Sequence, residues 1–203
     1  MRGFQTQQSK PATAEYYGIT HSSQSPGSSI SWSNLNFPAD DCYIFAFVNT
    51  VSSSNIETNS LTIGGVVATR LAITRRMSLW RAHVAGATGA ASATLASSVS
   101  NSVQLALFAV RGLKSVDPVQ LNAYAGTGSS QTISVKRGGI VLAGVASLSG
   151  DTSSIVFTGL DVLSSRTTGS QRMGMAMRSF DADVLDHPIT MTNVGRVIVV
   201  SLR

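Results

Sequence analysis

Catalysis in this 203-residue chain would have to begin at its histidines, carboxylates or single cysteine. A hydrolase pairs a nucleophile with a base and an orienting acid, and the available bases are His21, His83 and His187. The sequence contains no G-x-S-x-G, H-E-x-x-H, G-x-x-x-x-G-K-[ST] or C-x-x-C motif, so the signatures of the common hydrolase, zinc and phosphate sites are missing. We therefore predict a protein that is not an enzyme; a hydrolase would need a cleft that joins His83 or His187 to carboxylates.

A cluster of three carboxylates near the C-terminus is the best candidate for a metal site. Asp181, Asp183 and Asp186 fall in a loop that we expect between two strands, and carboxylate oxygens are the ligands that Ca²⁺ prefers. The segment lacks the glycine and the distal glutamate of an EF-hand loop, and aspartate is common in loops because it caps backbone amides. We therefore predict no metal and no cofactor, with Ca²⁺ at this cluster as the weaker alternative.

The two tryptophans, Trp32 and Trp80, both fall on expected strands. Exposed aromatic rings on a β-sandwich can stack on sugars, but alternation places Trp80 in phase with Ala82 and Val84, and aromatic residues are only 6% of the chain. A chain with so few aromatic side chains needs both rings in its core. We therefore expect core packing, with sugar stacking as the alternative.

The charge balance limits the partners that the chain could bind. Charged residues are 12% of the sequence, about half the roughly 25% that is typical of soluble domains. The net charge is +5, and the basic residues are Arg70, Arg75, Arg76, Arg81, Lys136, Arg137, Arg166, Arg172 and Arg178 among others. Because no run of five or more basic residues occurs, we interpret them as dispersed charge at strand ends rather than as a basic face for an acidic partner. With few aromatic residues for stacking and no apolar run long enough to span a bilayer, neither nucleic acid nor a membrane is an expected partner.

Strand-like alternation dominates the chain from Ser28 onward. Apolar residues recur with a period of two, and clusters of Gly, Asn, Asp and Ser interrupt them every 8 to 12 residues or so, which is typical of an antiparallel all-β protein. Segments 42–48 and 140–145 are apolar on both faces, so we expect them to be covered on both sides. A short helix is conceivable only at 115–121, where Asp117-Pro118 favours a turn instead.

The first 27 residues differ from the rest. They are rich in Gln, Ser and Thr, show no apolar period and end in the turn-like Ser25-Pro26-Gly27, so we predict an extended N-terminal arm over residues 1–27. Phe4, Tyr16 and Tyr17 are the candidate anchors with which this arm would dock on a partner. Packing of the arm on its own domain is the alternative.

Residues 28–203 are expected to form one β-sandwich domain that repeats itself weakly. The segments at 29–32, 44–51, 61–65, 77–84, 94–97 and 103–110 have counterparts, in the same order and about 95 residues later, at 132–135, 140–148, 155–159, 173–180, 189–192 and 197–202. A spacing this long suits two related halves, approximately 28–113 and 130–203, rather than a solenoid. We predict that the two halves together build one two-sheet antiparallel β-sandwich or jelly roll.

Several of these segments resemble a known class of proteins. Residues 61–69, Leu79-Trp80-Arg81-Ala82, the Ala/Ser/Thr strand 91–97 and Leu107–Leu113 with Asp117-Pro118-Val119 are similar in order to virion-associated β-sandwich proteins of tailed bacteriophages, which serve as capsid decorations, head fibres or tail components. The resemblance covers about residues 28 to 202 and brings no catalytic residues.

The resemblance implies a non-enzymatic structural role in a virion assembled in the host cytoplasm. The implied partners are other virion proteins, namely major capsid, portal, tail or fibre subunits, and further copies of the chain in a homo-oligomer. The alternative function on the same fold is a carbohydrate-binding adhesin that recognises a host surface glycan.

Overall fold

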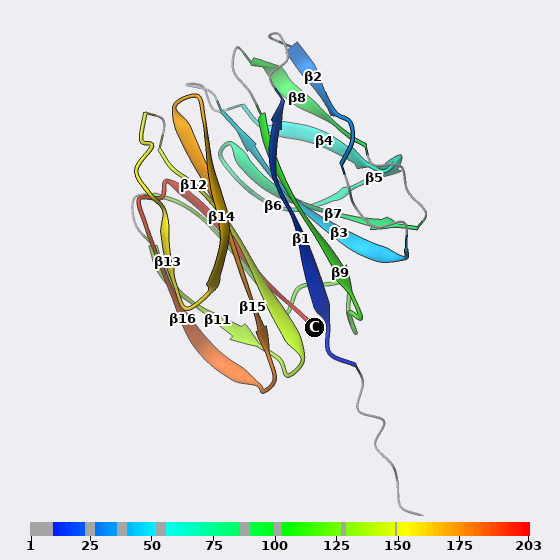
Figure 1. Cartoon of the computed structure of the whole chain (residues 1–203), viewed down its shortest axis with the longest axis vertical. Coiled ribbons are helices and arrows are strands. Elements are labelled where there is room, and N and C mark those ends of the chain that lie inside the picture. The colour runs from blue at the N-terminus through cyan, green and yellow to red at the C-terminus, as the bar shows by residue number, and fades with distance from the viewer. Residues whose placement is uncertain are drawn as a thin grey trace, which may run out of the picture.

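The protein is an all-β molecule in the computed structural model, which describes residues 10–22, 27–35, 40–51, 56–85, 90–99, 103–126, 129–148 and 150–203 (Figure 1). The strands in the described residues are β1 (Thr13–Ser22), β2 (Gly27–Trp32), β3 (Cys42–Thr50), β4 (Thr58–Ile63), β5 (Val66–Val67), β6 (Thr69–Thr74), β7 (Met77–Val84), β8 (Ala91–Val99), β9 (Val103–Arg111), β10 (Gln120–Ala125), β11 (Ser129–Val135), β12 (Gly139–Ala146), β13 (Val156–Thr158), β14 (Asp161–Thr168), β15 (Gln171–Phe180), β16 (Val184–Thr192) and β17 (Arg196–Leu202). All of their pairings are antiparallel. The predicted all-β sandwich class is confirmed, and none of the described residues is helical, those at 115–121 included.

The strands form four sheets that are stacked as four layers. The first inner sheet has the order β1-β9-β3-β7-β6, and the first outer sheet, β2-β8-β4-β5, covers it. The second inner sheet has the order β10-β17-β12-β15-β14, and the second outer sheet, β11-β16-β13, covers that one. In Figure 1 the second pair of sheets lies on the left and the first pair on the right, with the two inner sheets facing each other.

The two pairs of sheets are repeats of one topology. Strand by strand, β1 corresponds to β10, β2 to β11, β3 to β12, β4 to β13, β6 to β14, β7 to β15, β8 to β16 and β9 to β17. The predicted order of repeated segments agrees with this correspondence. The structure differs from the prediction in two details. Each half builds its own two-sheet sandwich, and the halves span 13–111 and 120–202 because β1 and β10 are their first strands.

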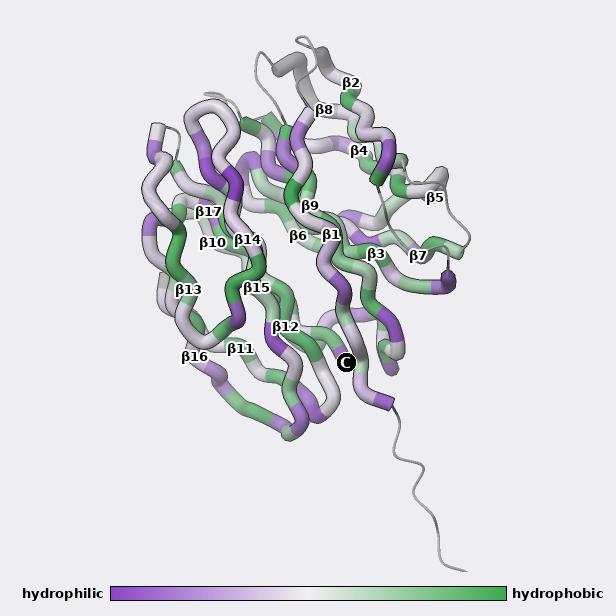
Figure 2. The backbone as a smooth tube through the Cα atoms, in the orientation of Figure 1, coloured by the Kyte–Doolittle hydropathy of each residue, from purple (hydrophilic) through white to green (hydrophobic). Residues whose placement is uncertain are grey.

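Three hydrophobic cores hold the four layers together. One lies within the first module (β1–β9), one lies within the second module (β10–β17), and the third fills the seam between the two inner sheets. Along β17 the two sides alternate: Ile198 and Val200 face the seam, whereas Val197 and Val199 face the outer sheet. The central inner strands are therefore apolar on both faces, and Figure 2 shows hydrophobic stretches along β9 and β12 within the stack.

The seam has an approximate twofold symmetry. Strand β1 lies beside β14 at one side of the seam, and β6 lies beside β10 at the other. Exchanging each strand for its counterpart turns the first of these pairs into the second. The modules therefore face each other as two subunits of a symmetric dimer would, although they belong to one chain.

The N-terminal arm is shorter than predicted. Residues 13–22 form β1, which pairs along β9 from Thr13↔Arg111 to Ser22↔Val103 as an edge strand of the first inner sheet. The alternation of β1 is interrupted by a bulge between Tyr16 and Ile19, where Gly18 has φ +84°, and this hides the strand in the sequence. Phe4 lies outside the described residues.

The connection between the modules anchors the C-terminus. The amides of Lys114 and Ser115 both donate to the carbonyl of Arg203, at 2.7 and 3.0 Å. Within the described residues, no helix is long and apolar enough to cross a membrane.

Candidate functional site

The three carboxylates of the predicted metal cluster do not converge. Asp183 accepts a hydrogen bond of 2.6 Å from the Arg137 amide and lies 3.6 Å from Nζ of Lys136. Asp186 lies within β16, at a bulge where its φ is +52°. No group of three His, Cys, Asp or Glu side chains that could hold a metal occurs in the described residues, which include all three aspartates. Asp183 is therefore a cap on the turn between β11 and β12.

Replacing Asp183 with asparagine is expected to lower the melting temperature slightly at neutral pH. The Arg137 amide, followed by Lys136, lowers the pKa of Asp183 below its ordinary value of 3.8, so the carboxylate stabilises the fold above that pH and ceases to do so as the pH falls through the lowered pKa. The difference between Asp183→Asn and the wild type should accordingly fade in acid, as followed by thermal denaturation. Added Ca²⁺ should change neither curve; a Ca²⁺-dependent rise in the wild type alone would restore the metal site.

His83 and His187 make different contacts. His83 Nε2 lies 2.5 Å from Oδ1 of Asp41 on the surface, and its ring packs against Tyr43. His187 Nε2 lies 2.7 Å from the Gly159 carbonyl, with its ring edge against Phe180. The hydrogen bonds of the described residues join neither histidine to a serine or cysteine. His83 is thus paired with a carboxylate on the surface, whereas the hydrogen bond of His187 is with a backbone carbonyl.

The predicted docking tyrosines are used inside the molecule. Tyr16 packs on Phe108 at 5.1 Å between ring centroids, and its hydroxyl is hydrogen-bonded to Ser164 of β14 across the seam. Tyr17 packs against the core of the first module, where burial, followed by the neighbouring Glu15, raises its pKa to about 12. Both side chains therefore pack on their own domain, and docking of these residues on a partner stays a prediction.

Both tryptophans are core residues, as predicted. Trp80 is buried and donates from Nε1 to the Ser78 hydroxyl at 2.7 Å. Trp32 is 4% exposed and lines an open depression of about 440 Å³ on the first outer sheet. The other residues that line this depression have small side chains, and four of them carry a hydroxyl group: Ser31, Ser33, Thr62, Gly65, Ala90, Ala91 and Ser92. Trp32 Nε1 has no partner among the described residues.

Two edge strands of the second module expose apolar side chains to solvent. Val156 on β13 is 51% exposed and Val162 on β14 is 56% exposed. Each strand is the last in its sheet, and the two lie next to each other. We call Val156, Val162 and their strands the β13–β14 edge. An edge with exposed apolar residues and free backbone groups is a template for contact with another chain.

The seam ends in a polar layer that the sequence did not reveal. At the C-terminal end of β3, Asn49 Nδ2 donates to Oε1 of Gln104 at 2.8 Å and to Oε1 of Gln171 at 3.3 Å. Gln171 belongs to β15, so this contact joins the two modules. All three side chains are fully buried, and their amides fix how the inner sheets meet.

The same end of the seam holds two buried arginines. Arg196, the first residue of β17, is 1% exposed, and Arg76, in the turn between β6 and β7, is 8% exposed. Burial, followed by the positive charges of Arg76 and Arg75, lowers the pKa of Arg196 to about 10. The guanidinium therefore stays charged at neutral pH.

No protein-family model, curated protein or solved structure matches this chain.

Proposed function

We propose that the chain is a non-enzymatic structural subunit of a tailed-phage virion, a capsid decoration or a tail or head-fibre component, that acts by packing against neighbouring subunits. The observation that carries the proposal most directly is the exposed β13–β14 edge on a sparsely charged, four-layered block. A subunit that assembles needs apolar contact area and little charge to desolvate. The resemblance of the sequence to virion-associated sandwiches supports the same conclusion.

Lysines at the β13–β14 edge are expected to abolish assembly. In the double variant Val156→Lys/Val162→Lys, two exposed valines become charges that would have to be desolvated at a subunit contact, as in natural strategies against edge pairing. The folded protein should keep its melting temperature because both side chains already face solvent. Light scattering after size exclusion would measure the loss of self-assembly, and co-sedimentation with purified virions would measure the loss of binding to the particle.

The matched control is Ser60→Lys, which adds a charge at an exposed position on β4 in the other module. It should assemble as the wild type does. A wild-type chain that stays monomeric at every concentration and is missing from purified particles would contradict the proposed function.

A host-glycan adhesin is the second candidate, and the depression beside Trp32 is the observation that favours it. Its hydroxyls could hydrogen-bond a sugar, although the buried Trp32 ring offers almost no face for stacking. Specific binding of the wild-type chain to a glycan array, lost on Thr62→Val at the rim of the depression, would favour this function over the first.

A further inference from the structure

We infer that Arg76 and Arg196 form a binding site for a small oxyanion of the phosphate or sulfate class at the polar end of the seam. The charge at this end of the seam is unbalanced. Two guanidinium groups are buried there, and a buried charge is retained at low cost only when an opposite charge and hydrogen-bond acceptors accompany it.

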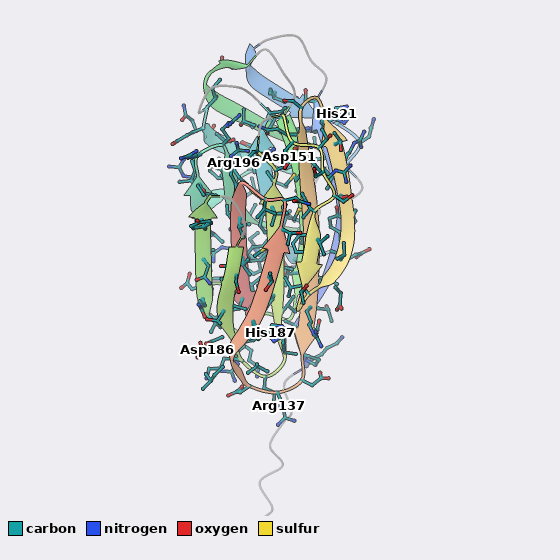
Figure 3. All side chains as sticks on the ribbon, turned by 90° about the vertical axis from the view of Figure 1, so that its left-hand side faces the viewer. His21, Arg137, Asp151, Asp186, His187 and Arg196 are labelled. Carbon is teal, nitrogen blue, oxygen red and sulfur yellow. The ribbon has the colours of Figure 1, made fainter. Side chains whose placement is uncertain are left out.

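None of the ion pairs among the described residues involves these arginines. All ten carboxylates of the sequence lie among the described residues, and their ion pairs involve Arg81, His83, Arg111 and Lys136. Asp151 lies toward the same end of the molecule as Arg196 (Figure 3), but its carboxylate accepts from the Ser153 amide at 2.8 Å. Ser153, and after it Arg172, lowers the pKa of Asp151; Arg196 does not contribute.

Three donor atoms of the two arginines also lack acceptors in the described residues. Nε and Nη1 of Arg76 and Nε of Arg196 are buried without a hydrogen-bond partner in the described part of the chain. Arg196 reaches one carbonyl, that of Ser147, at 3.4 Å from Nη1. Guanidinium groups in this state match the geometry and charge of a tetrahedral oxyanion, which accepts several charge-assisted hydrogen bonds at once.

Strand register places the two arginines at the same end of the seam: Arg196 pairs with Ala146, two residues after Gly144, and Gly144 lies against Met77, the residue that follows Arg76. Asn49 pairs with Met77 and Gln104 in the first inner sheet, and Ala146 pairs with Met173 and Arg196 in the second. Arg196 therefore occupies the place that Gln104 occupies in the first module.

The same correspondence adds a third residue to the set of Asn49 and Gln104 and a third to the set of Ala146 and Arg196. Gln171 precedes Met173 by two residues, as Arg75 precedes Met77. One set of related positions thus carries the amides of Asn49, Gln104 and Gln171, which are joined by the two hydrogen bonds from Asn49 Nδ2. The other set carries Ala146, Arg196 and the exposed Arg75, and the buried Arg76 follows Arg75 directly in the chain. The unpartnered donors of Arg196 and Arg76 lie beside this second set, and an oxyanion would accept their hydrogen bonds.

The ligand should be a free ion rather than part of a macromolecule. Arg196 is 99% removed from solvent and Arg76 leaves only 8% of its surface exposed. The phosphates of a nucleic acid are attached to a bulky chain, which could not follow them between the two inner sheets. A single inorganic ion has no such attachment.

Calorimetric titration with inorganic phosphate and with sulfate tests the inference. Wild-type protein should bind one ion, and its melting temperature should rise with phosphate relative to chloride at matched ionic strength. Arg196→Met keeps the length of the side chain without its charge and should weaken binding about tenfold or more. Arg76→Gln should do the same if Arg196→Met does not fold.

The control variant is Arg137→Met, whose exposed arginine lies at the opposite end of the molecule in Figure 3. It should bind phosphate as the wild type does. Equal stabilisation of wild type, Arg196→Met and Arg76→Gln would overturn the site, as would crystals soaked in selenate that show water only between the two guanidinium groups. Saturable binding of an oligonucleotide without any binding of free phosphate would overturn the assignment to a small ion.

Discussion

Substituting Gly144 with alanine is expected to lower the free energy of unfolding by roughly 3 kcal/mol, the upper range for overpacking a core. A Cβ at this position would lie 2.8 Å from Cε1 of Phe47 and 2.7 Å from Cε of Met77. Phe47 is fully buried at the centre of the seam and packs edge-on against Phe108. Its ring has no room to withdraw, so the inner sheets would have to separate.

Phe47 and Gly144 occupy equivalent places in the two modules. Phe47 pairs with Leu79 and Ala106, and Gly144 pairs with Met175 and Ile198. A large residue in one module thus fills the space left by the smallest residue at the same place in the other.

A double-mutant cycle isolates this contact. Phe47→Ala alone should cost about 3–5 kcal/mol because it leaves a cavity, and adding Gly144→Ala to it should cost less than Gly144→Ala costs in the wild type. Chemical denaturation measures each value.

The matched control for this cycle is Gly174→Ala, also in the second inner sheet. A Cβ there would lie 3.3 Å from Ile155 and Phe157, so we expect a change within about 1 kcal/mol. Additive effects of Phe47→Ala and Gly144→Ala would contradict the proposed fit of the seam.

Cutting the chain in the connection between the modules is expected to give two fragments that are stable only together. Fragments 1–115 and 116–203 would each expose one face of the seam, including Phe45 and Phe108 in the first and Leu142 and Ile198 in the second. An exposed apolar face of this kind drives association or aggregation. Each fragment alone should therefore fail to yield a stable monomer, whereas co-expression should give a 1:1 complex.

The fit of Phe47 against Gly144 also predicts which dimers of the two fragments form. In a dimer of the first module, two Phe47 rings would face each other in the seam. In a dimer of the second module, two Gly144 residues would face each other and leave a void. The mixed pair alone combines the large and the small residue, so it should dominate in native mass spectrometry. Stable monomers of either fragment, or homodimers as abundant as the mixed pair, would contradict this account.

The sequence was sufficient to predict the class, most central strands and the internal repeat. These features depend on apolar alternation, which is strongest where strands are buried on both faces, as in 42–48 and 140–145. The same pattern contained evidence for four layers, because a strand covered on both sides needs a layer on each side. A two-sheet sandwich cannot provide that, whereas the four stacked sheets of the structure do.

Two edge strands, β1 and β14, escaped prediction for a physical reason. β1 and β14 are half-exposed, and each contains a register shift, between Tyr16 and Ile19 and between Val162 and Ser164. A shift of this kind reverses the alternation partway along the strand. The candidate anion site was equally hidden, because nothing in the sequence distinguishes Arg196 at a buried strand start from an arginine in a solvent-exposed turn.

The twofold relation between the modules has a consequence for how such a molecule can evolve. Identical subunits must change on both sides of their axis at once, so every substitution at a symmetric contact is made twice. Tandem fusion of a duplicated gene removes that restriction. One copy could acquire a bulky ring and interlocking amides while the other acquired a glycine and arginines, a division of labour that no homodimer of either half could reach.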